Sequence, residues 1–159
     1  MLFRSVNGKF TKRQRDVYDA VLRVMKAATK MLVVGNVIPK YHEEVGRLME
    51  EELIRLGLLK SDEVKKQDPK QPLYKKYFMH GTSHFLGLDV HDIGNRYEPM
   101  KAGNVFTCEP GIYIPEEGLG IRIENDILIT EKGPVDLMAK IPIEAEEIEE
   151  LMAKSRVTA

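Results

Sequence analysis

The chain has 159 residues, of which 43% are hydrophobic and 31% charged, and its formal net charge is −1. This length and balance predict one soluble domain with a core of its own, and they give no electrostatic reason to expect nucleic acid or a membrane surface as a partner. No apolar run approaches membrane-spanning length, and Arg4 follows Leu2 and Phe3 too closely for a signal peptide. The one cysteine, Cys108, excludes a disulfide within the chain and favours a reducing, cytoplasmic setting.

The N-terminal part of the chain predicts a short strand and then a helix. Residues 2–10 read as the strand, with an Asn-Gly turn signal inside them. Thr11 and Gln14 form a capping-box pattern at the start of the helix. Apolar residues then recur at helical spacing, which predicts one buried face. Gly35 suits the C-terminal cap of this helix.

A second amphipathic helix is predicted from Pro39, which suits the first turn of a helix, to Gly57, which suits its end. His42 lies apart from the other histidines in the sequence, and we expect it to be an exposed surface residue. Residues 60–72 are polar and contain two prolines, so they predict a loop or a short helix that faces solvent.

Three of the four histidines fall within twelve positions, at His80, His84 and His91. Gly-Thr-Ser separates the first two, and these residues form helices poorly, so the segment predicts extended or irregular backbone rather than a helical HExxH zinc motif. Histidine ligates metals and moves protons near neutral pH. Backbone hydrogen bonds would explain one such histidine, but three in a short glycine-containing run favour a functional site.

Residues 106–118 and 119–130 predict the two arms of a β-hairpin. The second arm alternates strictly, with isoleucines on one face and Arg122 and Glu124 on the other. The first arm ends in a Pro-Glu-Glu-Gly turn signal. With the turn centred between the two glutamates of that signal, Glu109 lies directly opposite Glu124.

Like charges opposite each other destabilise a sheet, so a positive group is expected between Glu109 and Glu124. A bound metal ion is the simplest candidate. The alternative, two solvated surface glutamates, agrees less well with the apolar residues that surround them. Cys108 lies among these apolar residues and is predicted to be buried packing rather than a nucleophile.

The last part of the chain predicts a turn at residues 131–133 and an acidic helix over residues 145–154. Ile148, Leu151 and Met152 are expected to form the buried side of this helix. Its glutamates near the N-terminal end suit the helix dipole.

The segments HGTSHFLGLDVHD, EPGIYI and GIRIENDILIT cover most of residues 77–130. Together and in this order they resemble motifs in the C-terminal half of Xaa-Pro aminopeptidases, which belong to the pita-bread metallopeptidases. The resemblance implies an α+β, pita-bread fold that is N-terminally incomplete, with helices on a curved antiparallel sheet. It makes residues 1–159 a single domain, the C-terminal portion of a metallopeptidase catalytic domain.

The resemblance also implies a metal site. His84, Glu109 and Glu124 match three of the family's five ligands to two divalent ions, manganese in many relatives. Glu109 additionally handles the proton of the nucleophilic water, and Glu124 bridges the two metals. We therefore expect the side chains of these three residues to converge on one point.

Three further residues match supporting positions of the family. His91 corresponds to a histidine near the scissile carbonyl. His80 corresponds to a histidine beside the substrate or behind the metal ligands, and Arg122 to an arginine that supports the metal carboxylates. The implied reaction is release of the N-terminal residue from peptides with proline in the second position.

The family's other two metal ligands are aspartates on an upstream strand, and residues 3–11 resemble the segment that follows the second of them. The chain is therefore expected to lack two ligands and to be inactive alone. The alternatives are a non-catalytic pita-bread binding or remnant domain and an Xaa-Pro dipeptidase. An open strand edge near residues 2–10 would favour a homo-oligomer.

Overall fold

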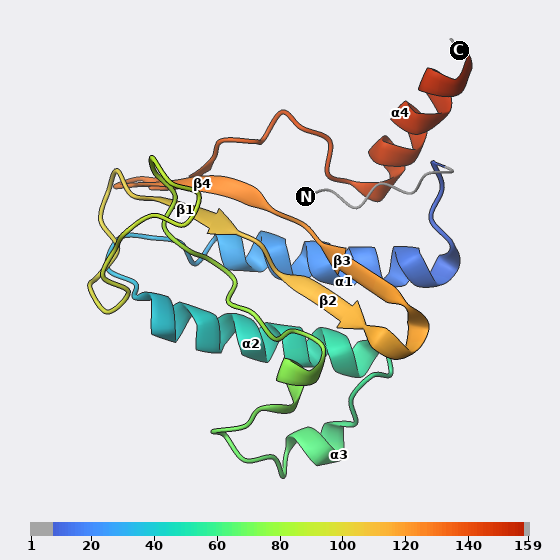
Figure 1. The fold of residues 1–159 in the computed structure, drawn as a ribbon, viewed down its shortest axis with the longest axis horizontal. Coiled ribbons are helices and arrows are strands. Elements are labelled where there is room, and N and C mark those ends of the chain that lie inside the picture. Colours follow the sequence, from blue (N-terminus) through green and yellow to red (C-terminus); the bar gives the residue numbers. More distant parts are fainter. Residues whose placement is uncertain (1–7, 158–159) are drawn as a thin grey trace.

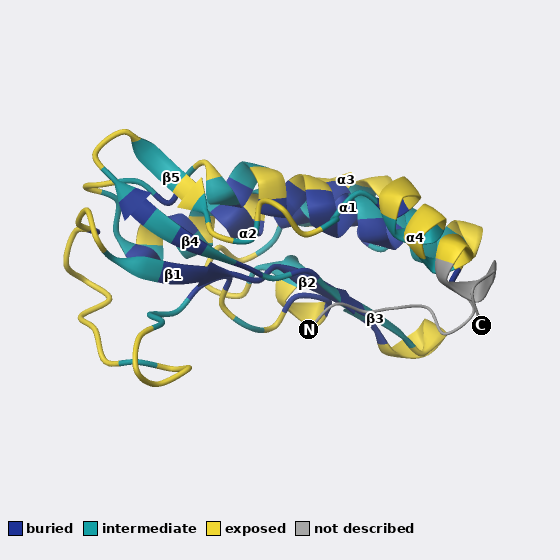
Figure 2. Cartoon of the chain, turned by 90° about the horizontal axis from the view of Figure 1, so that it is seen from above, coloured by how far each residue is buried: buried dark blue, intermediate teal, exposed yellow. Residues whose placement is uncertain are grey.

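The computed structural model describes residues 8–157, with side chains through residue 154. A helical layer and a β-ribbon lie against each other (Figure 2). Helices α1 (Lys12–Thr29) and α2 (Ile38–Arg55) are side by side and run in opposite directions beneath the ribbon (Figure 1). The other elements are α3 (Ser61–Val64), the 3₁₀ turns η1 (Leu73–Lys76) and η2 (Pro115–Glu117), strands β1 (Val105–Cys108), β2 (Gly111–Ile114), β3 (Leu119–Arg122), β4 (Asn125–Thr130) and β5 (Gly133–Asp136), and α4 (Ala145–Val157).

The starts of both long helices are as predicted. Thr11 and Gln14 form the capping box of α1, each side chain accepting a backbone N–H of the other residue. Pro39 lies in the first turn of α2. Gly57, with a φ of 74°, follows the C-cap of α2 and adopts the left-handed conformation that glycine favours.

The prediction that Gly35 caps α1 is wrong. The helix ends at Thr29 with Lys30 as its C-cap. Gly35 does have a φ of 88°, but its N–H donates to the carbonyl of Met100, 2.9 Å away. The left-handed glycine therefore turns the connection towards α2 instead of closing the helix.

Strand pairing confirms the predicted register of the hairpin. Gly111 lies opposite Arg122 in β2 and β3, and Cys108 lies opposite Asn125 in β1 and β4, so both pairs continue one register. The ladder is interrupted between the two pairs, at Pro110, which has no N–H to donate. The two glutamates of interest flank this break, facing each other where the sheet is open.

Two features of the C-terminal part differ from the prediction. Strand β5 pairs with β4 but was not predicted, because it begins with Gly133-Pro134, which reads as a turn. Helix α4 forms where expected, but Leu151 is 50% exposed rather than buried. The strand predicted over residues 2–10 lies outside the described residues except for residues 8–10, which belong to no strand. In the described part of the chain, no helix is both long and apolar enough to cross a membrane.

The core lies between the two long helices and the buried face of the ribbon (Figure 2). Alternation along the strands supplies one side of it and helical periodicity the other. The largest side chains that are almost completely buried are Tyr18, Leu32, Tyr41, Met49, Leu53, Phe106, Ile112, Ile114, Ile121, Ile123, Ile127 and Ile129.

Replacing Ile127 by alanine is expected to destabilise the fold strongly. The side chain is completely buried, and an Ile→Ala change in a core costs about 2–5 kcal/mol because transfer energy is lost and a cavity remains. Val135→Ala on the neighbouring strand is the control, since Val135 is 46% exposed and such surface changes stay within about 0.5 kcal/mol. Urea unfolding measures both, and equal losses would contradict this view of the core.

Candidate metal centre

The histidine segment is irregular, as predicted, and runs along the open edge of β1. The N–H of Glu109 donates to the carbonyl of Thr82 at 2.8 Å, and the N–H of Thr107 donates to that of His84 at 3.2 Å. Phe85 and Phe106 form an isolated antiparallel bridge. These contacts place His84 beside the strand end that carries Glu109.

The imidazole of His84 is oriented by its own neighbour in the chain. Nδ1 lies 2.9 Å from the carbonyl oxygen of Phe85. A carbonyl can only accept, so Nδ1 carries the proton and, in the neutral ring, Nε2 keeps its lone pair. Nε2 lies 3.3 Å from Oε1 of Glu109. Two acceptor atoms at this separation repel each other unless a proton or a cation lies between them.

Arg122 contacts both carboxylates of the hairpin. One terminal nitrogen lies 3.4 Å from Oε2 of Glu109, and the other lies 3.2 Å from Oε2 of Glu124. The guanidinium therefore supplies part of the positive charge that the facing glutamates were expected to require. It also restricts the orientation of both carboxylates.

The expected convergence of His84, Glu109 and Glu124 is confirmed. Each offers one ligand atom, and these atoms lie within 4.8 Å of one another. Two ligands of one ion, each about 2.0–2.6 Å from it, lie up to roughly 5 Å apart. Their side chains are only 24%, 12% and 23% exposed, respectively. The donor set fits a divalent cation.

Thr107 also belongs to the site and was not singled out from the sequence. Its hydroxyl accepts the N–H of His84 at 3.1 Å and donates to Oε1 of Glu109 at 3.4 Å. It joins the backbone of one candidate metal ligand, His84, to the side chain of another, Glu109. Thr107 and Glu109 are two positions apart in an extended segment, so their side chains lie on the same side of the hairpin. This period-two spacing could have identified Thr107 from the sequence.

Tyr113 is a second missed residue with the same period-two signal. Its hydroxyl lies 2.8 Å from Nε2 of His80, whose Nδ1 lies 2.8 Å from the carbonyl oxygen of Gly81. The carbonyl requires a proton on Nδ1, so in the neutral ring Nε2 accepts from the tyrosine. Burial raises the pKa of Tyr113, which keeps it a donor. His80 is thereby held beside the hairpin face that carries Arg122.

His91 is brought next to the metal-ligand candidates but remains exposed. Its ring centroid lies 4.3 Å from that of His84. It belongs to an exposed loop in which Leu88 and Ile93 are almost fully accessible to solvent. The site is thus flanked by one restrained histidine, His80, and one exposed histidine, His91.

Cys108 is completely buried, as predicted. Its Sγ lies 3.6 Å from the hydroxyls of Thr29 and Tyr41. Burial raises the pKa of the thiol to about 11, so it remains protonated near neutral pH. The residue packs against α1 and α2, and a buried, protonated thiol is a poor nucleophile.

The prediction that His42 is an exposed surface residue is wrong. Its ring is half-buried beneath the histidine segment, and its Nε2 accepts the N–H of Ser83 at 3.2 Å. A Cβ added to Gly81 would come within 2.7 Å of the His42 ring. Burial is the main reason why the pKa of His42 falls to about 4, and the nearby charge of Arg96 lowers it further.

The depressed pKa of His42 predicts a pH-dependent stability. Between pH 6.5 and 4 the unfolded chain protonates this imidazole and the folded chain does not, so acid favours unfolding. Stability from this group is complete above pH 6.5 and is lost as the pH falls towards 4, by roughly 3 kcal/mol in all. Urea unfolding at a series of pH values measures this. His42→Gln should show a shallower fall, and an unchanged slope would contradict the assignment.

The model of metallopeptidase family M24 matches residues 2–131. The Xaa-Pro aminopeptidase of Escherichia coli is 44% identical over 165 residues, which cover 95% of this chain and 36% of the relative. The Xaa-Pro aminopeptidase of Haemophilus influenzae is 42% identical, covering 92% and 36%. Intermediate cleaving peptidase 55 of Saccharomyces cerevisiae is 39% identical, covering 92% and 29%. The chain thus spans about a third of the length of the curated relatives it matches.

Solved structures of related enzymes resemble the chain in both sequence and fold. Escherichia coli aminopeptidase P with the inhibitor Pro-Leu has a TM-score of 0.83 at 44% identity, covering 95% of this chain and 37% of that one. The zinc-substituted enzyme with product has a TM-score of 0.83 at 43% identity and the same coverage. This likeness confirms the expected α+β fold of the pita-bread type.

Proposed function

The chain belongs to metallopeptidase family M24, and on that premise we propose that it forms the C-terminal portion of the catalytic domain of an Xaa-Pro aminopeptidase. The proposed reaction is hydrolysis of the first peptide bond of substrates with proline in the second position. The observation that carries this proposal is the convergence of one imidazole and two carboxylates at a break in the hairpin.

Membership of this family implies divalent metal ions, and we propose two, with manganese as the preferred ion. His84, Glu109 and Glu124 would hold them. Carboxylate oxygens with a single imidazole suit manganese and similar hard cations better than a thiolate-type site would. When bound, the metal pair would polarise the scissile carbonyl and lower the pKa of a water molecule.

The residues of the chain are assigned the following roles. Glu109 accepts the proton of the attacking water, because its Oε1 faces the site while its Oε2 contacts Arg122. Arg122 holds the two glutamates in place. His91, exposed beside His84, stabilises the negative charge that develops on the carbonyl oxygen. His80, restrained by a hydrogen bond at each ring nitrogen, orients the substrate.

The test of the proposed function is a release assay for the first amino acid. The substrates are two peptides that differ only in proline or alanine at the second position, and the enzyme contains this chain together with the rest of a catalytic domain. Metal-dependent cleavage of the proline peptide is expected, with little cleavage of the alanine peptide. No cleavage of either peptide in the presence of manganese would favour a non-catalytic pita-bread domain, and cleavage of dipeptides alone would favour an Xaa-Pro dipeptidase.

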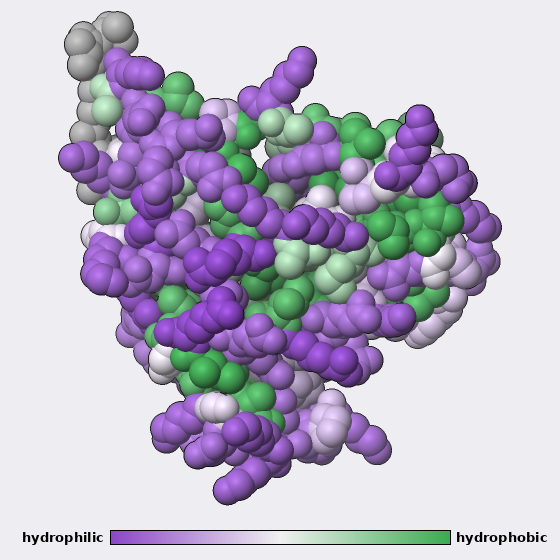
Figure 3. Space-filling view, turned by 180° about the vertical axis from the view of Figure 1, so that it is seen from behind, coloured by the Kyte–Doolittle hydropathy of each residue, from purple (hydrophilic) through white to green (hydrophobic). Residues whose placement is uncertain are grey.

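Self-association is proposed as well. Leu88, Val90, Ile93 and Tyr97 are all more than two thirds exposed. Seen from behind, the molecule also has apolar residues at its surface in several areas (Figure 3). Clustered apolar exposure favours association. Light scattering is expected to give the mass of a dimer or a larger species, and Leu88→Ser with Ile93→Ser should lower it. A monomer mass independent of concentration would contradict the proposal.

The proposed location is the cytoplasm, because the one cysteine of the chain is buried as a free thiol. Cell fractionation measures this directly.

A further inference from the structure

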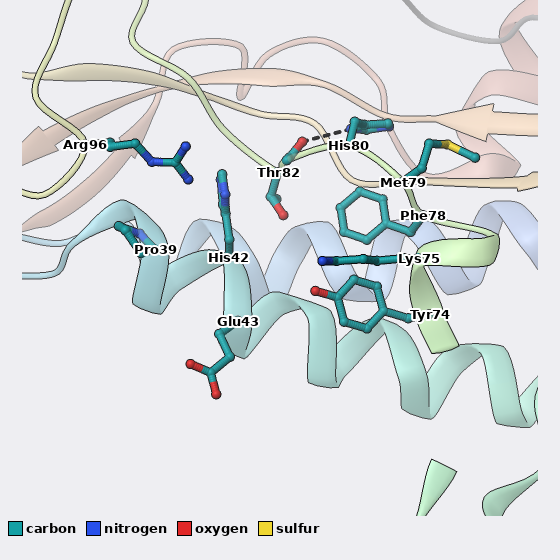
Figure 4. Close-up of a pocket in the computed structure, with 11 residues that line it drawn as sticks. Pro39, His42, Glu43, Tyr74, Lys75, Phe78, Met79, His80, Thr82 and Arg96 are labelled. Carbon is teal, nitrogen blue, oxygen red and sulfur yellow. Dashed lines mark hydrogen bonds between the residues drawn. The ribbon is translucent and has the colours of Figure 1, made fainter. Parts of the chain in front are cut away.

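A pocket with a volume of about 340 Å³ lies next to His80. It is enclosed by the first half of α2, by η1 and the histidine segment, and by Arg96 (Figure 4). His80 lines this pocket and is also hydrogen-bonded to Tyr113, which lies on the same face of the β2–β3 ladder as Arg122. His80 therefore connects the pocket to the hairpin face that carries the metal-ligand candidates.

Two cationic side chains face the pocket without an acidic partner among the described residues. Lys75 and Arg96 reach towards it from opposite sides (Figure 4). Within the described part of the chain, the Arg96 guanidinium lies 5.8 Å from the centroid of the Tyr97 ring, and its charge acts on His42. It has no other partner there. Glu43 also lines the pocket, but its carboxylate points away and pairs with Arg47 (Figure 4). The interior of the pocket therefore carries a positive charge.

Neutral donors add to these cations. Nε2 of His42 accepts the N–H of Ser83, so the proton of its neutral ring is on Nδ1. The Thr82 hydroxyl is buried, its residue being 1% exposed, and it has no hydrogen-bond partner within the described part of the chain. Thr82 lies between His42 and Phe78 in the pocket wall (Figure 4). An unpaired buried hydroxyl is unfavourable, and an acceptor in this pocket would satisfy it.

We propose that this pocket binds the C-terminal carboxylate of a short peptide whose scissile end lies at His84, Glu109 and Glu124. A carboxylate is an acceptor-only group that matches the fork of an arginine and the charge of a lysine. The apolar side chains of Phe78, Met79 and Pro39 supply surface for the residue that carries it. The peptide would cross His80, which borders both places. This inference rests on the proposed function for the scissile end, but the carboxylate pocket can be tested separately.

The first experiment tests the pocket alone, with sodium acetate as the probe. Acetate is titrated into residues 1–159 while NMR follows the amides of Gly81 and Thr82 and the side-chain Nε–H of Arg96. Saturable shifts are expected at all three. Lys75→Gln with Arg96→Gln should weaken binding by about tenfold or more, because charge-assisted hydrogen bonds are lost, and Thr82→Val should weaken it less.

The matched control is Lys65→Gln with Lys66→Gln, which removes the same charge from two exposed positions directly after α3. This control should leave acetate binding within about twofold of the wild type, since screening limits the effect of distant charges. Absence of saturable shifts in the wild type, or equal weakening in both double variants, would overturn the carboxylate site.

The second experiment tests the connection to substrate. Calorimetry compares peptides of two to five residues, with proline second, as free acids and as C-terminal amides. At one length the acid is expected to bind at least about tenfold more tightly than the amide, and Lys75→Gln with Arg96→Gln should abolish this preference. Acetate binding without any acid preference would mean that the pocket takes a free anion, which overturns the substrate assignment. If the free-acid peptide binds more tightly but the release assay described above shows no hydrolysis, the proposed function is refuted and the carboxylate pocket is still supported.

Discussion

Residues 1–159 alone are expected to release no measurable amino acid from a peptide with proline second, even with manganese added. Within residues 8–154 the site supplies three donors, His84, Glu109 and Glu124, whereas a hard divalent ion takes about six ligands. Two ions about 3.5–4 Å apart repel each other and need bridging carboxylates between them. With only these two carboxylates as anionic ligands, one ion would bind weakly and a second would not be retained. Without the ion pair, Glu109 has no activated water from which to accept a proton.

Supplying the two aspartate ligands that the family resemblance implies should restore the activity. A chimera is made in which this chain replaces the matching 36% of the Escherichia coli Xaa-Pro aminopeptidase, so that the rest of the catalytic domain comes from the relative. Amino-acid release is measured for the chain, the chimera and the chimera with Glu124→Gln, each with bound metal counted by mass spectrometry. The chimera alone should turn over. Robust manganese-dependent turnover by residues 1–159 would refute this prediction and would mean that another carboxylate completes the site.

The second large effect is expected for Glu109→Gln in the same chimera. The amide keeps the shape of the side chain and its hydrogen bonding to Thr107, but it cannot accept a proton from water. Loss of a positioned general base lowers kcat by about 10²–10⁴-fold. The weaker ligand strength of the amide should also reduce the bound metal, so kcat is measured at saturating manganese to separate the two effects.

Glu131→Gln is the matched control for this change. Glu131 is an exposed residue in the turn after β4, and the substitution removes the same charge from the same hairpin region. Its kcat should equal that of the parent within about twofold, as for other surface substitutions. A kcat for Glu109→Gln that stays near the parent value, with metal bound, would show that a different group handles the proton.

Local sequence patterns predicted much of this fold correctly. The capping box of Thr11 and Gln14 lies within one helical turn, so propensity and hydrogen bonding act on neighbouring residues. The register that places Glu109 opposite Glu124 follows from the turn length, because side chains alternate with a period of two along both arms. The resemblance of three short motifs to Xaa-Pro aminopeptidases then added the family, which no periodicity could supply.

Contacts between distant segments explain the errors and omissions. Helical periodicity describes only the helix that carries His42, while the histidine segment that covers this residue lies about forty positions later in the chain. Strand β5 forms because β4 offers an edge for pairing, although its first two residues favour a turn. Arg122 bridges Glu109 and Glu124 only because the fold brings both carboxylates next to its guanidinium.

By itself, the sequence determined which residue types were available and on which face of its own strand or helix each would lie, because those properties arise from the backbone geometry of a few neighbouring residues. Together with the resemblance to Xaa-Pro aminopeptidases, it was enough to propose His84, Glu109 and Glu124 as metal ligands. Only the tertiary structure decided that Thr107 contacts His84 and Glu109, that Tyr113 holds His80, and that Lys75, Arg96 and Thr82 share a pocket beside His80. Those groupings join separate elements across the layers of the fold, and packing of the common core, rather than any local preference, brings them together.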